Sequence, residues 1–269
     1  MTSMVRIAVC GAAGRMGQRI IVSALEAGCT VSGALERPGH PMLGQDAGLL
    51  AGCGQIGVAI SDDTNAVVEG CDVLIDFTTP AVSLKNLELC GLKNKAIVIG
   101  STGFNKDERA LAQELSKTVP CVLAPNMSVG VNVCFKALKD IAATLGDDFD
   151  VEIVEMHHRL KKDAPSGTAV RMGEVVAEAL GRDYAEVANC HREGFTGERT
   201  HSEIGMQTVR GGDIIGEHTV YFIGMGERIE LSHRAMTRDM FSRGSVRAAK
   251  WLAGKEPGIY DMQDVLGLK

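Results

Sequence analysis

The sequence predicts an α/β fold, in which an N-terminal Rossmann-type, doubly wound parallel sheet is joined to a smaller α+β domain built on an open mixed sheet. Three observations predict it. Short apolar runs alternate with helical patterns in the first half, a glycine-rich turn follows the first run, and the rhythm changes after about residue 128. We expect the first domain to comprise residues 1–128 and 238–269, and the second residues 129–237.

Continuous apolar runs in the first half predict parallel strands that are buried on both faces. The runs VRIAVC, DVLIDF and KAIVIG are typical of such strands. Between them, apolar residues recur at helical spacing, as expected of crossover helices. Strands are expected at residues 6–10, 31–35, 73–77, 96–99 and 119–123, and helices at residues 16–25, 82–92 and 107–115.

Strand-like segments of the second half alternate in polarity, which indicates a sheet with one face on helices and the other against solvent or a partner. A last helix ends at Gly254 with Pro257 close behind, a normal stop signal, although its pattern does not assign it to a domain. Helices are expected at residues 131–145, 168–180 and 238–252, and strands at residues 151–156, 205–210, 214–225 and 228–235.

The composition is that of a globular protein, with 45% apolar and 23% charged residues in 269. A net charge of -6 argues against general nucleic-acid binding, which needs an excess of Lys and Arg. The eight cysteines form no CxxC pair and are expected to be reduced core residues. Without an export pattern or an apolar run of the ~20 residues that span a bilayer, we expect a cytoplasmic protein with no membrane partner.

Gly11, Gly14 and Gly17 form a GxxGxxG pattern between the first expected strand and the first expected helix. In that setting the pattern predicts a dinucleotide site, because the glycines allow a tight turn, close approach of a pyrophosphate and close packing of helix on strand. The pyrophosphate would lie on the helix N-terminus, and Arg15 could add a charge contact. The alternative is that the glycines serve only the turn.

Glu36, at the end of the next strand, is placed to bind a ribose 2'-hydroxyl, while Arg37 beside it could accept a 2'-phosphate. The pair therefore permits NADH or NADPH, unless Arg37 is simply a solvated loop charge.

Two further loops follow later strands, at residues 100–103 and 124–128, and we assign them to the nicotinamide side. Ordinary turn chemistry would favour similar residues. The residues expected to contact the dinucleotide are Gly11, Ala12, Ala13, Gly14, Arg15, Met16, Gly17, Glu36, Arg37, Gly100, Ser101, Thr102, Ala124, Pro125, Asn126 and Met127.

The segment EIVEMHHRLKKDAPSGTA, residues 152–169, concentrates polar chemistry between an expected strand and an expected helix. On a strand, His157 and His158 would point to opposite faces, so they do not form a conventional metal site, and no metal is expected. Lys161 and Lys162 follow in the loop. A solvated basic face is the plain alternative for this run.

A helix is expected to begin around Ser166, Gly167 and Thr168, where backbone amides and hydroxyls could bind a carboxylate or phosphate. The alternative is that Ser166 or Thr168 merely caps the helix. Capping does not explain the imidazole and basic groups immediately upstream.

This segment resembles the signature of the 4-hydroxy-tetrahydrodipicolinate (dihydrodipicolinate) reductase family of lysine and diaminopimelate biosynthesis. The resemblance extends through GAAGRMG, residues 100–103, APNMSVGVN and REGFTGER, and so covers nearly the whole chain. The matching signature residues are Glu152, Ile153, Glu155, His157, Lys161, Asp163, Pro165, Ser166, Gly167, Thr168 and Ala169.

The resemblance implies a reductase that uses NADH or NADPH on a small cyclic dicarboxylate, typically as a homotetramer, with the last helix returning to the first domain. It implies proton transfer by His157, proton donation by Lys161, and substrate contacts from His158, Gly167 and Thr168. From the residues themselves we add Ser166 to the substrate contacts. The chemistry agrees, because hydride addition to a conjugated C=C/C=N system must be followed by a proton. Whether His157 or Lys161 delivers that proton stays open.

Two other functions fit the glycine pattern. One is a different nicotinamide-dependent dehydrogenase of a neighbouring pathway, which would not be expected to carry HHRLKKDAPSGTA. The other is a non-enzymatic redox sensor, which binds the dinucleotide and needs no proton donor.

Overall fold

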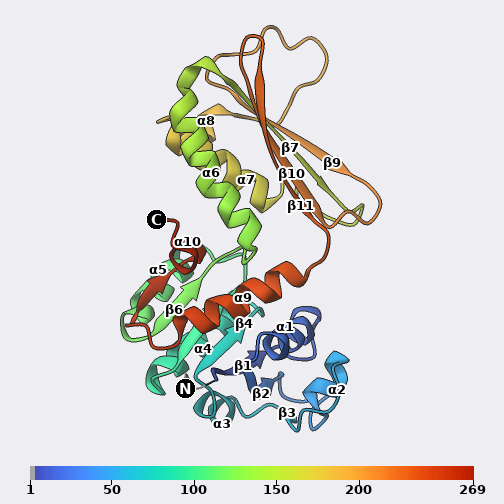
Figure 1. Ribbon diagram of the computed structural model, residues 1–269, viewed down its shortest axis with the longest axis vertical. Coiled ribbons are helices and arrows are strands. Elements are labelled where there is room, and N and C mark those ends of the chain that lie inside the picture. The colour runs from blue at the N-terminus through green and yellow to red at the C-terminus, as the bar shows by residue number, and fades with distance from the viewer. Residues whose placement is uncertain (1–3) are drawn as a thin grey trace. The chain divides into compact units, whose positions relative to one another are not determined.

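The computed structural model describes residues 4–269, which divide into two compact units. We call them the N-terminal unit, with the described residues up to Val129 and Asp239–Lys269, and the central unit, Gly130–Arg238. Figure 1 shows the elements of both units.

The N-terminal unit is built on a seven-stranded sheet in the order β12-β6-β5-β4-β1-β2-β3, and every pairing in it is parallel. The strand order reverses between β1 and β4, which is where doubly wound folds bind their ligands. The strands are β1 Arg6–Cys10, β2 Thr30–Leu35, β3 Ile60–Ser61, β4 Val73–Asp76, β5 Ala96–Ile99, β6 Pro120–Leu123 and β12 Gly258–Tyr260.

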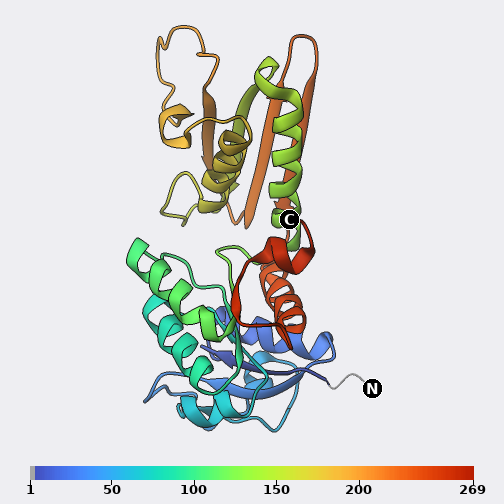
Figure 2. The same ribbon diagram turned by 90° about the vertical axis from the view of Figure 1, so that its left-hand side faces the viewer.

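Helices cover both faces of this sheet, and each face has its own apolar cluster (Figures 1 and 2). Residues of α1, α2, α9 and α10 join one cluster, while residues of α3, α4 and α5 join the other. The helices are α1 Arg15–Glu26, α2 Ala47–Ala51, α3 Thr64–Glu69, α4 Pro80–Leu92, α5 Lys106–Leu115, α9 Asp239–Leu252 and α10 Met262–Leu266, with a 3₁₀ turn at Ser116–Thr118.

The C-terminal helix α9 packs within the N-terminal unit. Its Ser242 hydroxyl lies 2.8 Å from that of Ser23 in α1, and both side chains are buried. Gly244 lies so close to the chain after β6 that an added Cβ would be 1.8 Å from the Met127 carbonyl oxygen. The helix whose sequence pattern left its domain open therefore belongs to this unit.

The central unit is built on a five-stranded mixed sheet in the order β11-β10-β7-β9-β8. β10 pairs antiparallel with β11 and β7, whereas β9 pairs parallel with β7 and β8. The strands are β7 Asp150–His157, β8 Ala188–Asn189, β9 Ile204–Arg210, β10 Gly216–Ile223 and β11 Arg228–Ala235. The helices are α6 Val129–Leu145, α7 Gly167–Ala179 and α8 Tyr184–Val187, with a 3₁₀ turn at Gly146–Asp148.

One face of this sheet packs against α6 and α7, and no helix of the described chain covers the other (Figures 1 and 2). The alternation in β7 divides the two faces. Val151, Ile153 and Glu155 are buried on the helix-covered side, while Glu152 and Val154 are half-buried on the open side. This sheet and the parallel one confirm the expected fold class.

The structure differs from the sequence-based expectation mainly in its short helices and strands, which were not predicted, and in the exposure of two cysteines. Helices such as α2 and strands such as β3 are too short for a periodic pattern to appear. Cys53 and Cys190 are exposed, so the expectation that every cysteine lies in the core is wrong for these two; both lie in loops, outside the apolar runs. No helix among residues 4–269 is long and apolar enough to cross a membrane.

Candidate active site

The glycine turn between β1 and α1 has the geometry its sequence predicts. Gly11 has a φ of +68°, a left-handed conformation that costs other residues more than glycine. A Cβ on Gly17 would lie 2.1 Å from the Gly11 carbonyl oxygen, so the helix crosses the turn at a distance that only glycine permits. The contact between the turn and α1 is therefore made by backbone atoms.

The N-terminus of α1 fits an anion. Its N-cap residue is Gly14, no side chain of residues 4–269 caps it, and its first turn contains no acid. By contrast, Asn105 and Glu108 form a capping box on α5. The first-turn amides of α1 are therefore the donors that a pyrophosphate would need, and the helix dipole favours its charge.

Glu36 lies beside this turn. Its Oε1 accepts a hydrogen bond from the Ala13 amide at 3.1 Å, and its Oε2 accepts one from the Arg37 amide at 3.2 Å. Arg37 itself is exposed. The structure thus places a carboxylate next to the glycine turn and an exposed guanidinium beside it.

The loops after β4, β5 and β6 lie at the same edge of the sheet. Buried Asp76 accepts hydrogen bonds from the Thr78 amide, at 2.8 Å, and from the Asn86 side chain, also at 2.8 Å. The ring of Phe77 packs so closely on Gly100 that a Cβ there would lie 2.3 Å from it. These contacts fix the shape of the loops.

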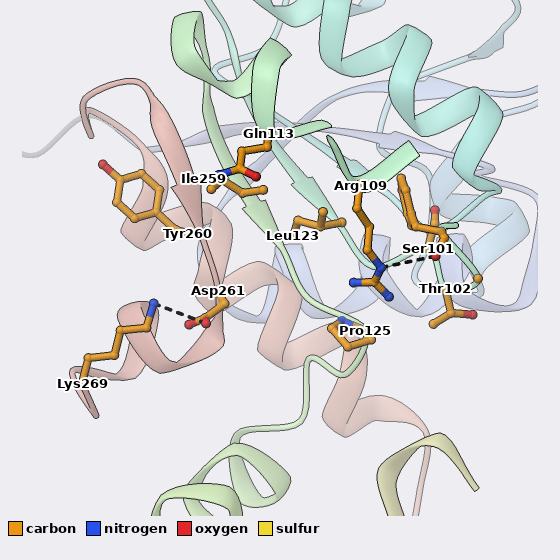
Figure 3. Close-up of a pocket in the computed structure, with 12 residues that line it drawn as sticks. Ser101, Thr102, Arg109, Gln113, Leu123, Pro125, Ile259, Tyr260, Asp261 and Lys269 are labelled. Carbon is orange, nitrogen blue, oxygen red and sulfur yellow. Dashed lines mark hydrogen bonds and ion pairs between the residues drawn. The ribbon is translucent and has the colours of Figure 1, made fainter. Parts of the chain in front are cut away.

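A cavity of about 370 Å³ opens between the β5 and β6 loops and the C-terminal strand β12 (Figure 3). Ser101, Thr102 and Pro125, all expected to contact the dinucleotide, line part of it. Arg109 and Asp261 contribute charge to the wall. The cavity lies at the carboxyl ends of parallel strands, where ligands bind in doubly wound folds.

Two expected dinucleotide residues use their side chains inside the protein. Met127 is 1% exposed and lies in the core, so the structure does not place this residue at a surface that a ligand could reach. The Asn126 side chain accepts a hydrogen bond from the Ser128 amide at 2.9 Å, which stabilises the turn after β6.

The polar segment of the central unit surrounds a buried carboxylate, Glu155, which is 1% exposed. Its Oε2 lies 2.6 Å from Nδ1 of His157 and 2.7 Å from Nη1 of Arg210. Its Oε1 accepts hydrogen bonds from the Ser166 amide at 3.0 Å and from Nη2 of Arg210 at 2.8 Å. Both oxygens therefore have strong donors.

These donors determine the charge of Glu155. Burial alone would raise the pKa of the carboxyl group, but hydrogen bonds from His157, Arg210 and the Ser166 amide outweigh it and bring the pKa to about 2. The group is therefore ionised at neutral pH.

His218 in β10 is the neutral partner in this cluster. Burial, assisted by the neighbouring His157, lowers its pKa to about 4, so its ring is neutral at pH 7. Its Nε2 lies 2.9 Å from the Ser166 hydroxyl, and its ring packs edge-on against that of His157, with centroids 5.1 Å apart.

The loop after β7 contains the remaining candidates. Nζ of Lys161 lies 2.8 Å from both carboxylate oxygens of Asp163, which lowers the pKa of Asp163. His158 lies just beyond the strand end, so the expectation that both histidines sit on a strand is wrong for it. Its Nδ1 is buried and has no hydrogen-bond partner among the described residues.

Ser166 is the N-cap of α7, and its Oγ accepts a hydrogen bond from the Ala169 amide at 3.2 Å. With its amide on Glu155 and its hydroxyl also on His218, its polar groups are engaged within the protein. Gly167, the next residue, is exposed, and an added Cβ there would meet nothing within 4 Å. Within the described part of the chain, no three His, Cys, Asp or Glu residues are grouped as a metal site would need.

Two family models match almost the whole chain. One, described as dihydrodipicolinate reductase, N-terminus, matches residues 5–127, and the other, dihydrodipicolinate reductase, C-terminus, matches residues 130–266. The chain belongs to the dihydrodipicolinate reductase family.

Curated relatives in this family are very similar. Proteins named 4-hydroxy-tetrahydrodipicolinate reductase from Geobacter metallireducens and Trichlorobacter lovleyi are 84% and 83% identical to this chain over 266 residues. Each alignment covers 99% of this chain and 100% of the relative.

Solved structures agree at the level of the fold. A dipicolinate-bound dihydrodipicolinate reductase from Paenisporosarcina sp. TG-14 is 25% identical with a TM-score of 0.75, and the match covers 97% of this chain and 98% of that one. An amine dehydrogenase from Mycobacterium smegmatis matches 96% of this chain and 95% of its own at 17% identity and a TM-score of 0.60. The second match shows a shared fold only.

The sequence did not indicate two residues of the candidate active site, Arg210 and His218. Arg210 and His218 lie on β9 and β10, far along the chain from the signature segment, yet they contact Glu155 and Ser166. The alternation in β7 places Glu155 on the apolar face of the strand. A carboxylate buried there needs a hydrogen-bonding or cationic partner. That signal indicates that a partner exists but does not identify it.

Proposed function

We propose that this protein reduces 4-hydroxy-tetrahydrodipicolinate to tetrahydrodipicolinate with NADH or NADPH, in lysine and diaminopimelate biosynthesis. The observation that carries the proposal is the near-complete alignment, at 83–84% identity, with relatives bearing the name of that reductase. The N-terminal unit would bind the dinucleotide, and the central unit the substrate.

The residues at the edge of the parallel sheet fit either nicotinamide cofactor, which when bound supplies the hydride. The uncapped start of α1 would bind the pyrophosphate, and Glu36 the ribose. Arg37 would allow a 2'-phosphate to bind. The loops that contain Ser101, Thr102 and Pro125 would adjoin the nicotinamide.

His157 and Lys161 would handle the proton that must follow hydride addition. With Nδ1 of His157 hydrogen-bonded to Glu155, Nε2 is the ring atom left to hold or transfer a proton. Lys161 carries three N–H donors on a flexible stem and can donate once Asp163 yields to the substrate. Either group would also stabilise negative charge that develops in the ring.

The substrate carboxylates would meet the start of α7. Gly167 is exposed there, and its amide together with Thr168 offers donors at the positive end of the helix dipole. His158, with its buried unpartnered Nδ1, would add a further contact. We assign Ser166 to the frame of this site, because its groups are engaged within the protein.

We also propose a cytoplasmic homotetramer in which central units associate through the open face of their sheets. This face presents apolar side chains, including Val209 and Ile223, which are 40% and 38% exposed. Sedimentation measurements on the purified protein would test the assembly.

The direct test is to mix the purified protein with the condensation product of pyruvate and aspartate semialdehyde and to follow NAD(P)H absorbance. We expect consumption of NAD(P)H that depends on that product. No consumption with either cofactor would contradict the proposed function.

Variants separate this enzyme from a non-enzymatic dinucleotide sensor. His157→Gln and Lys161→Met should each lower kcat by about 10²-fold or more, since each removes a proton-transfer group. NADH binding, measured by fluorescence titration, should be unchanged. Full turnover in both variants would refute their catalytic assignment.

A further inference from the structure

Glu155 contacts two parts of the proposed substrate site directly, and it is linked to the third through Arg210. Its carboxylate receives the ring of His157, the amide of Ser166 at the start of α7, and the guanidinium of Arg210. Nη2 of Arg210 also donates to the carbonyl oxygen of Asp163 at 2.7 Å, and that residue pairs with Lys161. The ion pair of buried Glu155 with half-buried Arg210 thus joins the strand end, the lysine loop and the helix start.

The charge of Glu155 determines which nitrogen of His157 carries a proton. An ionised carboxylate can only accept hydrogen bonds, so Nδ1 of His157, 2.6 Å away, must be the donor. Nε2 is then the nitrogen whose lone pair takes up a proton, and the imidazolium that forms can pass this proton on. A neutral amide at position 155 could instead donate to Nδ1 and leave the proton on Nε2.

The groups around Glu155 favour its ionised form. Arg210 from β9 forms a two-pronged pair with it, at 2.7 and 2.8 Å, and Thr208 donates to Oε1 at 3.2 Å. His218 faces the cluster from β10 with a neutral ring. Lys161 and Asp163 in the loop balance each other in charge.

We propose that Glu155, with Arg210 as its counter-ion, is a positioning residue for the reduction. It holds His157 with a proton on Nδ1 and an available Nε2, and it fixes the start of α7 where substrate carboxylates bind. This inference rests on the proposed function, and in particular on proton transfer by His157. Neither Glu155 nor Arg210 needs to touch the substrate.

The test is Glu155→Gln, which keeps the shape of the side chain and removes its charge. We expect kcat to fall by about 10²-fold or more because His157 adopts the wrong tautomer, while KM for NADH changes less than about twofold. Glu152→Gln is the matched control. Glu152 lies on the same strand and is also paired with an arginine, Arg192, but on the open face. It should retain kcat within about twofold, with assembly checked by sedimentation.

A double-variant cycle distinguishes positioning from general structural damage. If Glu155 acts through His157, adding Glu155→Gln to His157→Gln should lower kcat by less than about threefold further. An equal loss in both backgrounds would overturn the proposal. The wild-type assay and the single variant His157→Gln test the proposed function separately, so the two failures are distinguishable.

A measurement on the unaltered protein keeps the proposal testable if Glu155→Gln does not fold. In ¹⁵N-histidine-labelled protein, at a pH where the ring is neutral, the nitrogen shifts of His157 should show a protonated Nδ1 and a bare Nε2. A neutral ring with its proton on Nε2 would overturn the assignment. His157→Gln identifies the signal.

Discussion

Each unit buries a carboxylate near the end of a strand, but the two have opposite surroundings. Asp76, at the end of β4, is bonded to the neutral side chains of Thr78 and Asn86. Glu155, near the end of β7, is bonded to Arg210 and His157. The first carboxylate shapes a loop through local contacts, whereas the second sets charge and tautomer in a cluster drawn from three strands.

The contrast extends to the two binding edges. In the N-terminal unit, the proposed ligand site is largely backbone, made of a glycine turn and an uncapped helix. In the central unit it is made of ionisable side chains. The first site should therefore be most sensitive to steric change, and the second to pH and charge.

The largest effect is expected from Gly17→Ala. Its Cβ would lie 2.1 Å from the Gly11 carbonyl oxygen and 2.7 Å from Cα of Ala12, both backbone atoms that cannot rotate away. NADH affinity should fall by about 10²-fold, and the N-terminal unit should lose about 1–3 kcal/mol of stability, as overpacked sites do. Calorimetric titration with NADH measures the first effect, and denaturant unfolding the second.

Gly70→Ala is the matched control, since an added Cβ at Gly70 would make only ordinary van der Waals contacts, the nearest at 3.5 Å. It should bind NADH like the unaltered protein. If Gly17→Ala also binds normally, the N-terminal site does not depend on close backbone packing.

These two sites also show what a sequence can reveal. The roles of Gly11 and Gly17 follow from residues six apart in a turn, so the pattern alone predicts them. The strand before His157 and the helix after Ser166 are likewise encoded by local periodicity and a cap. Local patterns therefore predicted the fold class and the candidate segments.

The cluster around Glu155 could not be predicted in this way. Arg210 lies 55 residues along the chain from Glu155, and only the register of β7 with β9 brings them together. His218 reaches Ser166 through the pairing of β10 with β7. Strand register, rather than the residues next to Arg210 or His218 in the sequence, determines these partners.

The second prediction concerns acid. The folded pKa of His218, about 4, is lower than its ordinary value of 6.5. Between those pH values the unfolded chain binds a proton that the folded chain excludes, so stability falls as pH drops from 6.5 to 4. The loss should approach about 3 kcal/mol. The contribution of Glu155, whose pKa is lowered to about 2 from 4.5, is lost only below pH 4.5.

Hydrogen exchange of β7 and β10 amides, corrected for intrinsic rates, should report this loss in the central unit. Trp251, the only tryptophan in the chain, lies in the N-terminal unit. Denaturant unfolding followed by its fluorescence should show no matching loss of stability in that unit between pH 6.5 and 4. His218→Gln should reduce the slope in the central unit, where His233, whose pKa burial also lowers, accounts for the rest. If the stability of both units depended equally on pH in this range, the expected difference in pH sensitivity between them would be wrong.

A smaller effect is expected at Arg37, a cationic side chain beside the proposed ribose subsite. Arg37→Ala should reduce kcat/KM for NADPH by about tenfold and leave that for NADH within about twofold, because only a 2'-phosphate needs the guanidinium. Steady-state kinetics with both cofactors measure the ratio. An unchanged ratio would show that Arg37 is only a solvated loop charge.

The smallest effect is expected from Asp76→Asn, the counterpart of Glu155→Gln. Neutral donors surround Asp76, so an asparagine can still accept from Thr78, and the amide of Asn86 can turn to present its oxygen. NADH affinity should fall by less than about fivefold, as measured by titration, and kcat should change little. Since both variants replace a buried carboxylate by its amide, the difference between them isolates the role of charge. A loss for Asp76→Asn as large as that for Glu155→Gln would mean that any buried carboxylate at a strand end is equally critical, whatever its partners.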